Sequence, residues 1–120
     1  MDFISSHPPQ ETADLLESFL SGKGMKIFAR IDQAAEAAAV GLELRPTILL
    51  LFGNPKAGTP LMAQYPNLAL DLPLKALVWE EAGQVHVTFT SPEELKERYN
   101  LPITPFEAVP GLLKTALGAG

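Results

Sequence analysis

The chain has 120 residues, of which 47% are hydrophobic, and a formal net charge of −5 at pH 7. This length and apolar content predict one folded domain and exclude a disordered chain. The nine basic residues are scattered along the sequence, which argues against nucleic acid and anionic membrane surfaces as partners, because both require a concentrated basic face. Cysteine is absent, so disulfides, thiolate metal sites and cysteine nucleophiles are excluded.

Other features of the composition bear on compartment and cofactors. The N-terminal segment lacks the basic start and the long apolar run of a signal peptide. The longest apolar run, residues 48–52, is too short to span a bilayer. We therefore expect a soluble, cytoplasmic protein; a chain from which a leader had been removed would look the same. Nothing in the spacing of His7 and His86 indicates a metal site, and no cofactor is predicted.

The first part of the chain alternates between strand and helix patterns. A short strand is predicted over residues 2–6, and a helix over 9–21, whose apolar residues form one stripe between prolines and glycines. Residues 25–31 alternate as a strand does. Asp32 then stands at the N-cap position of an alanine-rich helix over 33–40, which a glycine ends.

Residues 45–62 hold the most informative pattern of the sequence. Residues 47–52 are apolar on both faces, which predicts a buried strand that needs cover on both sides. A helix layer can cover one face, and a second subunit or the remaining chain must cover the other, which is the sequence argument for a homodimer. A polar loop over 53–60 follows, and a short helix over 60–65 is predicted to be capped by Thr59.

The second half of the sequence predicts three strands and two helices. Residues 67–72 alternate as a strand next to a proline, which favours an edge or a bulge. Residues 74–80 and 84–90 form a hairpin pattern. A serine–glutamate capping box opens a helix over 92–99, and a last helix is predicted over 106–117, weakened by an internal Pro-Gly pair.

The hairpin allows two loop lengths. A three-residue loop over 81–83 places Gly83 in a left-handed position and pairs Trp79 with Val85, which collects the apolar side chains on one face. A four-residue loop would set Trp79 against His86 and lose that separation. The three-residue loop is the prediction.

These elements predict an α+β fold with two layers, in which helices pack on one face of a mainly antiparallel sheet of four to five strands. One domain is expected over residues 1–120, with a core over about 2–99 and a C-terminal helical extension over 100–120.

Four segments carry a family resemblance. They are residues 29–32 (ARID), 41–47 (GLELRPT), 52–62 (FGNPKAGTPLM) and 71–75 (DLPLK). Together they resemble the domain of unknown function 302 family, over about residues 5–99. The resemblance implies a small α+β domain with an antiparallel sheet backed by helices, often found as a dimer, and no established reaction. Members of that family often have histidine after the aspartate of the Ile-Asp pair, where this chain has Gln33, so no chemistry is placed there.

The candidate ligand-binding residues surround the polar loop. They are Arg45, Gly53, Asn54, Lys56, Gly58, Thr59 and Asp71. The order of lysine and glycine excludes a Walker loop, but backbone amides near Gly58 and the start of the following helix could hold a small anion or carboxylate, with added charge from Lys56. The structural alternative is that Gly53 and Asn54 make a turn and Thr59 is only a cap.

Three further side chains have a functional and a structural interpretation. Asp71 lies in an apolar stretch, so a raised pKa could make it a general acid or base beside Lys75. The preferred interpretation is that it faces outward or bonds to the backbone beside Pro73. Arg45 could clamp a carboxylate or phosphate, but a pair with Glu43, Asp32 or Asp71 is the preferred interpretation. His86 is expected to be a partly exposed structural residue.

Three functions follow, in order of preference. The first is a homodimeric binding or sensing module for a small anionic or polar ligand at residues 53–59. The second is a structural or dimerisation module without a ligand. The third is an enzyme that uses Asp71 as acid or base, and whether the chain is an enzyme stays open.

Overall fold

The computed structural model describes residues 1–118. Its centre is one five-stranded sheet with the order β1-β5-β4-β3-β2, and every neighbouring pair is antiparallel. The strands are β1 (Asp2–Ser5), β2 (Lys26–Asp32), β3 (Thr47–Gly53), β4 (Leu74–Glu81) and β5 (Gln84–Thr88). The predicted α+β class and antiparallel sheet are confirmed.

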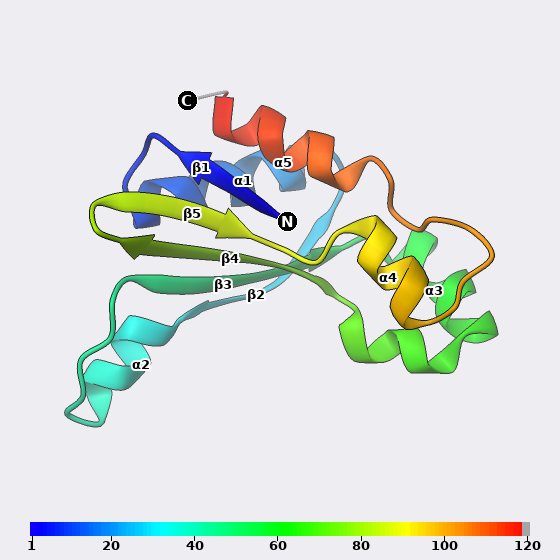
Figure 1. Cartoon of the computed structure of the whole chain (residues 1–120), viewed down its shortest axis with the longest axis horizontal. Helices are drawn as coiled ribbons and strands as arrows, with labels where there is room; N and C mark the ends of the chain where they lie inside the picture. The colour runs from blue at the N-terminus through cyan, green and yellow to red at the C-terminus, as the bar shows by residue number, and fades with distance from the viewer. Residues whose placement is uncertain (119–120) are drawn as a thin grey trace.

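Helices lie on one face of the sheet and at its two ends. They are α1 (Pro9–Gly22), α2 (Gln33–Ala39), α3 (Pro55–Gln64), the 3₁₀ helix η1 (Pro66–Asp71), α4 (Pro92–Arg98) and α5 (Val109–Gly118). Helices α1 and α5 pack together over one face, whereas α2 projects from one end of the sheet and α3 and α4 from the other (Figure 1).

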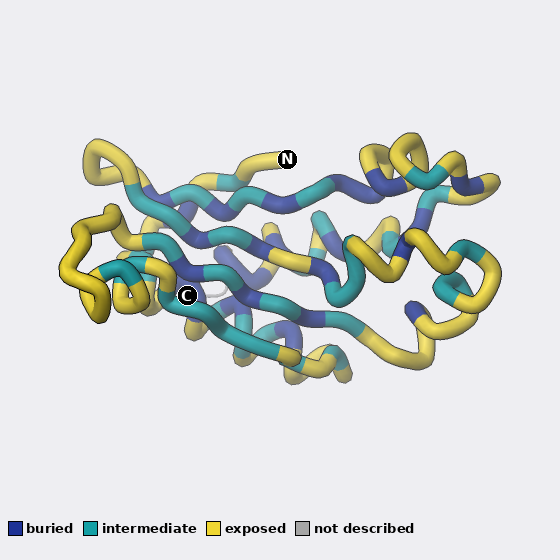
Figure 2. Tube along the Cα trace, turned by 90° about the horizontal axis from the view of Figure 1, so that it is seen from below, coloured by how far each residue is buried: buried dark blue, intermediate teal, exposed yellow. Residues whose placement is uncertain are grey.

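Strand β3 shows how the sheet divides the molecule. Ile48, Leu50 and Phe52 are fully buried on the face covered by helices, and Leu49 and Leu51 alternate with them as half-buried residues on the second face. Figure 2 looks onto this second face, where the strands lie in front of α1 and α5. The expectation that β3 is apolar on both faces therefore holds, and the helix layer covers one of them.

The core extends past Tyr99. Helix α5 contributes four buried side chains, and α1 meets it with its own buried stripe. The buried residues of α5 are Val109, Leu113, Ala116 and Leu117. The last helix is thus part of the core, not an extension beside it.

The hairpin differs from its predicted register. Strands β4 and β5 are joined by the two residues Ala82 and Gly83, with φ angles of 52° and 79°, and Trp79 pairs with His86. Two successive left-handed residues make the tight turn that matches the twist of a hairpin. The predicted three-residue loop is wrong because an alanine occupies a left-handed position. Trp79 lies with Leu77 on the second face, opposite to the buried Val85 and Val87.

The segment after β3 also differs from its prediction. Helix α3 begins at Pro55 and is capped by Asn54, whose Oδ1 accepts from the Lys56 N–H at 2.9 Å. The predicted start at Pro60 with a Thr59 cap is wrong, and Gly58 and Thr59 lie inside the helix. The strand predicted over 67–72 is η1, which Pro66 opens.

Two other caps were predicted correctly. Asp32 accepts from the Ala35 N–H at the start of α2. Ser91 and Glu94 form the expected reciprocal capping box at α4. Both motifs act within a few residues, so the local sequence is enough to specify them.

Candidate functional site

A partly open cavity of about 240 Å³ lies where β3 runs into α3. Four parts of the chain form its wall: Phe28 of β2, the stretch from Gly53 through the first turns of α3, the connection into β4, and Phe106 from the segment that joins α4 to α5. These parts are far apart in sequence, so the cavity is a product of tertiary packing.

One side of α3 forms a continuous part of the cavity wall. Asn54, Gly58 and Met62 are spaced by four residues and therefore lie along one side of the helix. Gly58 is buried, and a Cβ added there would lie 3.6 Å from Leu72 Cδ1 and 3.9 Å from Met62 Cε. These are ordinary contact distances, so the missing side chain leaves space that alanine would begin to fill.

The amides at the start of α3 are already used. Pro55 has no N–H, and the Lys56 N–H donates to Asn54 Oδ1 at 2.9 Å. The N–H groups of Ala57 and Gly58 donate to the Asn54 carbonyl oxygen at 3.0 and 2.9 Å. The expected anion site requires free backbone N–H groups here, and these groups already donate to Asn54.

The wall of the cavity carries no charge. Its side chains are mainly aromatic and aliphatic, including Phe28, Met62, Leu72 and Phe106. The polar side chains are Asn54 and Thr59, both exposed at the rim. Within residues 1–118, the side-chain nitrogen of Asn54 and the hydroxyl of Thr59 have no protein hydrogen-bond partner.

The structure brings together only some of the predicted site residues. Gly53, Asn54, Gly58 and Thr59 all line the cavity, whereas Lys56 is exposed and does not. Arg45 lies at the opposite end of β3, which is about 20 Å long. There the guanidinium of Arg45 pairs with Glu81 at 3.3 Å. The expected ion pair is present, but its partner is none of the three predicted acids, Glu43, Asp32 and Asp71.

Asp71 is held by a different set of contacts. Its Oδ2 accepts from the Tyr99 hydroxyl and from Arg98 Nη1, the latter at 2.8 Å. The hydrogen bond from Tyr99 and the charge of Arg98 lower the pKa of the Asp71 carboxyl. The raised pKa that the functional interpretation required is not found, because the chain supplies donors that the local sequence does not show. Asp71 links η1 to the end of α4.

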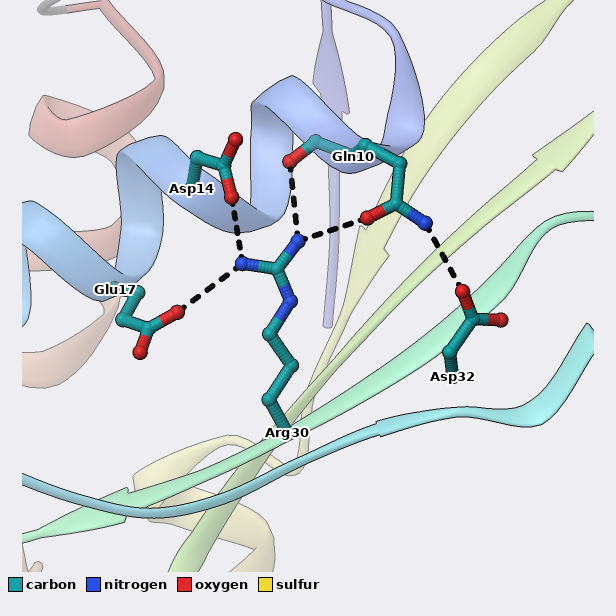
Figure 3. A network of polar contacts seen from close by, with 5 residues as sticks. All are labelled: Gln10, Asp14, Glu17, Arg30 and Asp32. Atoms are coloured by element: carbon teal, nitrogen blue, oxygen red, sulfur yellow. Dashed lines mark hydrogen bonds and ion pairs between the residues drawn. The ribbon is translucent and has the colours of Figure 1, made fainter. Parts of the chain in front are cut away.

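The densest polar network lies away from the cavity and joins β2 to α1 (Figure 3). Arg30 Nη1 donates to Asp14 at 2.6 Å and to Glu17 at 3.1 Å, and Nη2 donates to Gln10 Oε1 at 2.9 Å. Gln10 in turn donates to Asp32 at 3.0 Å. Since these side chains satisfy one another, we assign the network a structural role.

Sequence reasoning missed the apolar wall. The position of Phe28 could have been noticed in the sequence. It is an aromatic residue on the face of the predicted strand that otherwise carries Lys26 and Arg30. Its ring lies beside Gly53, where an added Cβ would be 3.8 Å from Phe28 Cε2. Phe106 had no such signal, since nothing in the sequence relates residue 106 to residue 58.

A solved structure of another protein has the same fold. A solved structure from Bacillus stearothermophilus, an uncharacterized conserved protein DUF302, superposes with a TM-score of 0.82 at 21% sequence identity, covering 98% of this chain and 94% of that one. At this identity the likeness shows the fold.

Curated relatives from two Brucella species share sequence with the chain. The proteins of Brucella suis and Brucella abortus are both named fluoride-specific ion channel FluC 1 and are 37% identical over 110 residues, which is 91% of this chain but 43% and 41% of theirs. The chain spans about two fifths of the length of these relatives. Across residues 1–118, no helix is long and apolar enough to cross a membrane.

The family comparison covers nearly the whole sequence. The profile of the family described as "Domain of unknown function DUF302" matches residues 1–117, from the first strand through most of α5. This is a wider span than the segments that carried the resemblance. The chain belongs to the family described as domain of unknown function DUF302.

Proposed function

We propose that the chain is a small-molecule binding module whose site is the cavity at the start of α3. The observation that carries the proposal is a concave, mainly apolar wall that holds two polar side chains at its rim. Binding sites for small molecules commonly combine apolar walls with a few polar groups that fix orientation. The proposal keeps the predicted place of the site, residues 53–59, and replaces its polar loop by a helix start.

The backbone at Phe106 supports the same assignment. This bulky residue has a φ of 55°. That value lies in the left-handed region, which residues other than glycine and asparagine rarely adopt. Such strain persists where the surrounding structure over-determines it, and it is concentrated at functional sites. Here the strained residue places an aromatic ring against the cavity.

Methyl NMR of the methionines tests the proposal. The chain has three methionines, Met1, Met25 and Met62, and Met62 alone among them lines the cavity. Protein labelled at the methionine methyl groups is titrated with a panel of neutral, cationic and anionic small molecules. The expected result is that some of them shift the Met62 signal in a saturable way while Met1 and Met25 stay in place. A panel that leaves Met62 unmoved up to its solubility limit would contradict the proposal.

A second candidate function is self-association through the second face of the sheet. Leu49 and Leu77 are paired neighbours on that face and are only half-buried. Helix α2 has no buried residue, and Val40, Leu42 and Leu44 directly after it are exposed. Apolar surface of this kind is typical of an interaction site, and a second copy of the chain would cover it as the sequence argument for a homodimer requires.

The proposal contains no catalytic step. The enzyme hypothesis needed Asp71 as an acid or base near neutral pH, whereas Tyr99 and Arg98 lower the pKa of this carboxyl. Its oxygen is also engaged by both donors. A binding role requires neither a titrating group nor a nucleophile at the cavity.

A further inference from the structure

We infer that the ligand of this cavity is an uncharged, mainly apolar ring compound with one hydrogen-bonding group, placed so that this group meets Asn54 and Thr59 at the rim. The inference rests on the proposed function and narrows its ligand class. It departs from the anionic ligand that the sequence favoured.

The absence of positive charge in the cavity wall indicates that the ligand is uncharged. No lysine, arginine or histidine lines the cavity, and the first amides of α3 are occupied by Asn54. A carboxylate moved from water into such surroundings would lose hydration and gain only the two neutral donors of Asn54 and Thr59, with no positive charge to offset the loss, which is costly. The chain also carries a net charge of −5, which disfavours the approach of anions.

The size of the ligand follows from the volume. A dry apolar cavity of about 150 Å³ is enough to hold benzene. The present cavity measures about 240 Å³, so one ring with a short substituent or two fused rings would fill it.

The shape of the ligand follows from the side chains that face it. Phe28 and Phe106 present aromatic rings, and Met62 presents a flexible, polarizable thioether. Aromatic rings pack well against other rings, and thioethers make favourable contacts with them. A planar ring compound therefore matches these walls better than a branched aliphatic one does.

The polar group of the ligand is placed by Asn54 and Thr59. The Asn54 side chain uses its oxygen for the helix cap, which leaves its NH₂ group as the available donor. The Thr59 hydroxyl can donate or accept. A carbonyl or hydroxyl oxygen on the ligand satisfies this pair, with the ring directed inward.

The test compares two ligands that differ in charge and hardly in shape, naphthalene-2-carboxamide and naphthalene-2-carboxylate. Binding is followed by the Met62 methyl signal, with Met1 and Met25 as internal references. The amide is expected to bind at least about tenfold more tightly, which corresponds to one hydrogen bond gained or an unpaired charge avoided. Its affinity should not change with salt concentration, because no ion pair forms.

Two variants locate the ligand. Gly58→Ala adds a Cβ at ordinary contact distance from Leu72 and Met62, so it should weaken amide binding while leaving the fold intact. Gly111→Ala, in α5 with nothing within 4 Å of the added Cβ, is the matched control and should bind as the unaltered chain does. Asn54→Asp keeps a capping oxygen and removes the NH₂ donor, so it should also weaken amide binding.

The outcomes separate this inference from the proposed function. Equal or tighter binding of the carboxylate would overturn the inference about charge while leaving the cavity as a binding site. If other members of the panel shift Met62 but neither naphthalene compound does, the inference about size and shape is wrong. If no compound shifts Met62, the proposed function fails together with the inference. Unchanged affinity in both Gly58→Ala and Asn54→Asp would place the ligand elsewhere.

Discussion

The indole ring of Trp79 is stacked on the imidazole of His86, with ring centroids 4.4 Å apart and an interplanar angle of 18°. Trp79 Nε1–H donates to Thr88 Oγ1 at 2.9 Å, and the Thr88 hydroxyl donates to Asp2 Oδ1 at 2.6 Å. The other oxygen of Asp2 lies 3.0 Å from His86 Nδ1. One cluster on the second face of the sheet thus connects β1, β5 and β4.

Removal of the Thr88 hydroxyl should weaken this cluster. Thr88→Val keeps the branched shape and leaves Trp79 Nε1–H and Asp2 Oδ1 without their partner, so we expect a loss of about 1 kcal/mol in the free energy of unfolding. Thr115→Val is the control, because the Thr115 hydroxyl bonds only to Gly111 of its own helix; it should cost less. Urea denaturation measures both, and equal losses would show that the cluster adds nothing.

Asp71→Asn should lower stability in a way that depends on pH. The pKa of Asp71 is lowered in the folded chain, so its contribution is present above the pKa of an unfolded aspartate, about 3.9, and is lost as pH falls through the lower folded value. With solvent screening allowed for, we expect a loss of about 1 kcal/mol at neutral pH.

The measurement is the urea midpoint of Asp71→Asn and of the unaltered chain at neutral pH and in acid below both pKa values. The difference between them should shrink in acid. Glu107→Gln, at an exposed acid in the segment between α4 and α5, is the control and should show little difference at either pH. A deficit of Asp71→Asn that persisted in acid would mean that charge is not its cause.

The turn between β4 and β5 can be improved. Ala82 has a φ of 52°, and asparagine is far better tolerated than alanine in the first position of this turn type. Ala82→Asn should therefore raise the free energy of unfolding by about 0.5–1 kcal/mol. Thermal denaturation measures the change, and a destabilised variant would argue against the two-residue turn and its register.

The strain at Phe106 can be measured with two substitutions that both remove the ring. Phe106→Ala keeps a Cβ in the left-handed conformation, with φ of 55°, whereas Phe106→Gly relieves it. We expect Phe106→Gly to be more stable than Phe106→Ala by about 1 kcal/mol. The comparison uses chemical denaturation. The opposite order would mean that residue 106 does not hold this conformation in solution.

Self-association can be tested on the second face of the sheet. If a second copy covers this face, the unaltered chain should sediment as a dimer and Leu77→Lys as a folded monomer, because a lysine there would be buried without a partner. Leu77 is half-buried and points away from the core residue Val78, so the fold should persist. Leu70→Lys, at an η1 side chain that is 78% exposed, is the control and should remain dimeric. A chain that is monomeric at every concentration would remove this proposal.

The sequence was informative wherever structure depends on near neighbours. The caps at Asp32 and Ser91 involve residues three positions away, and the alternation along β3 shows directly in its burial. The antiparallel sheet followed from these strand patterns, with the family resemblance in support. Local hydrogen bonding and side-chain periodicity are sufficient for such features.

The start of α3 shows where local signals compete. Asn54-Pro55 and Thr59-Pro60 are both a capping residue followed by proline, so each is a valid helix start. The chain uses the first, and Pro60 is accommodated inside the helix. Packing decides between them, because the longer helix buries Gly58 against Leu72, a contact between segments on either side of η1.

The candidate site depended on contacts that no local pattern shows. Asp71 is bound by Arg98 and Tyr99, which are 27 and 28 residues away. These partners lower its pKa, whereas the functional interpretation required a raised one. Arg45 and Gly53 are close in sequence but stand at the two ends of an extended strand. The position of the predicted loop at the cavity could be inferred from sequence, and the chemistry of the cavity wall could not.

The wall contributed by Phe106 has a consequence for local opening of the chain. Residues 99–108 form neither helix nor strand, and segments of this kind open more readily than the strands of a sheet do. A molecule in the cavity would contact this segment, α3 and β2 at once. The segment or α3 could then open only after its contacts with the bound molecule were broken. Occupancy of the cavity should therefore slow amide hydrogen exchange in residues 99–108 as well as in α3. The bound molecule would connect β2 of the sheet to this irregular segment.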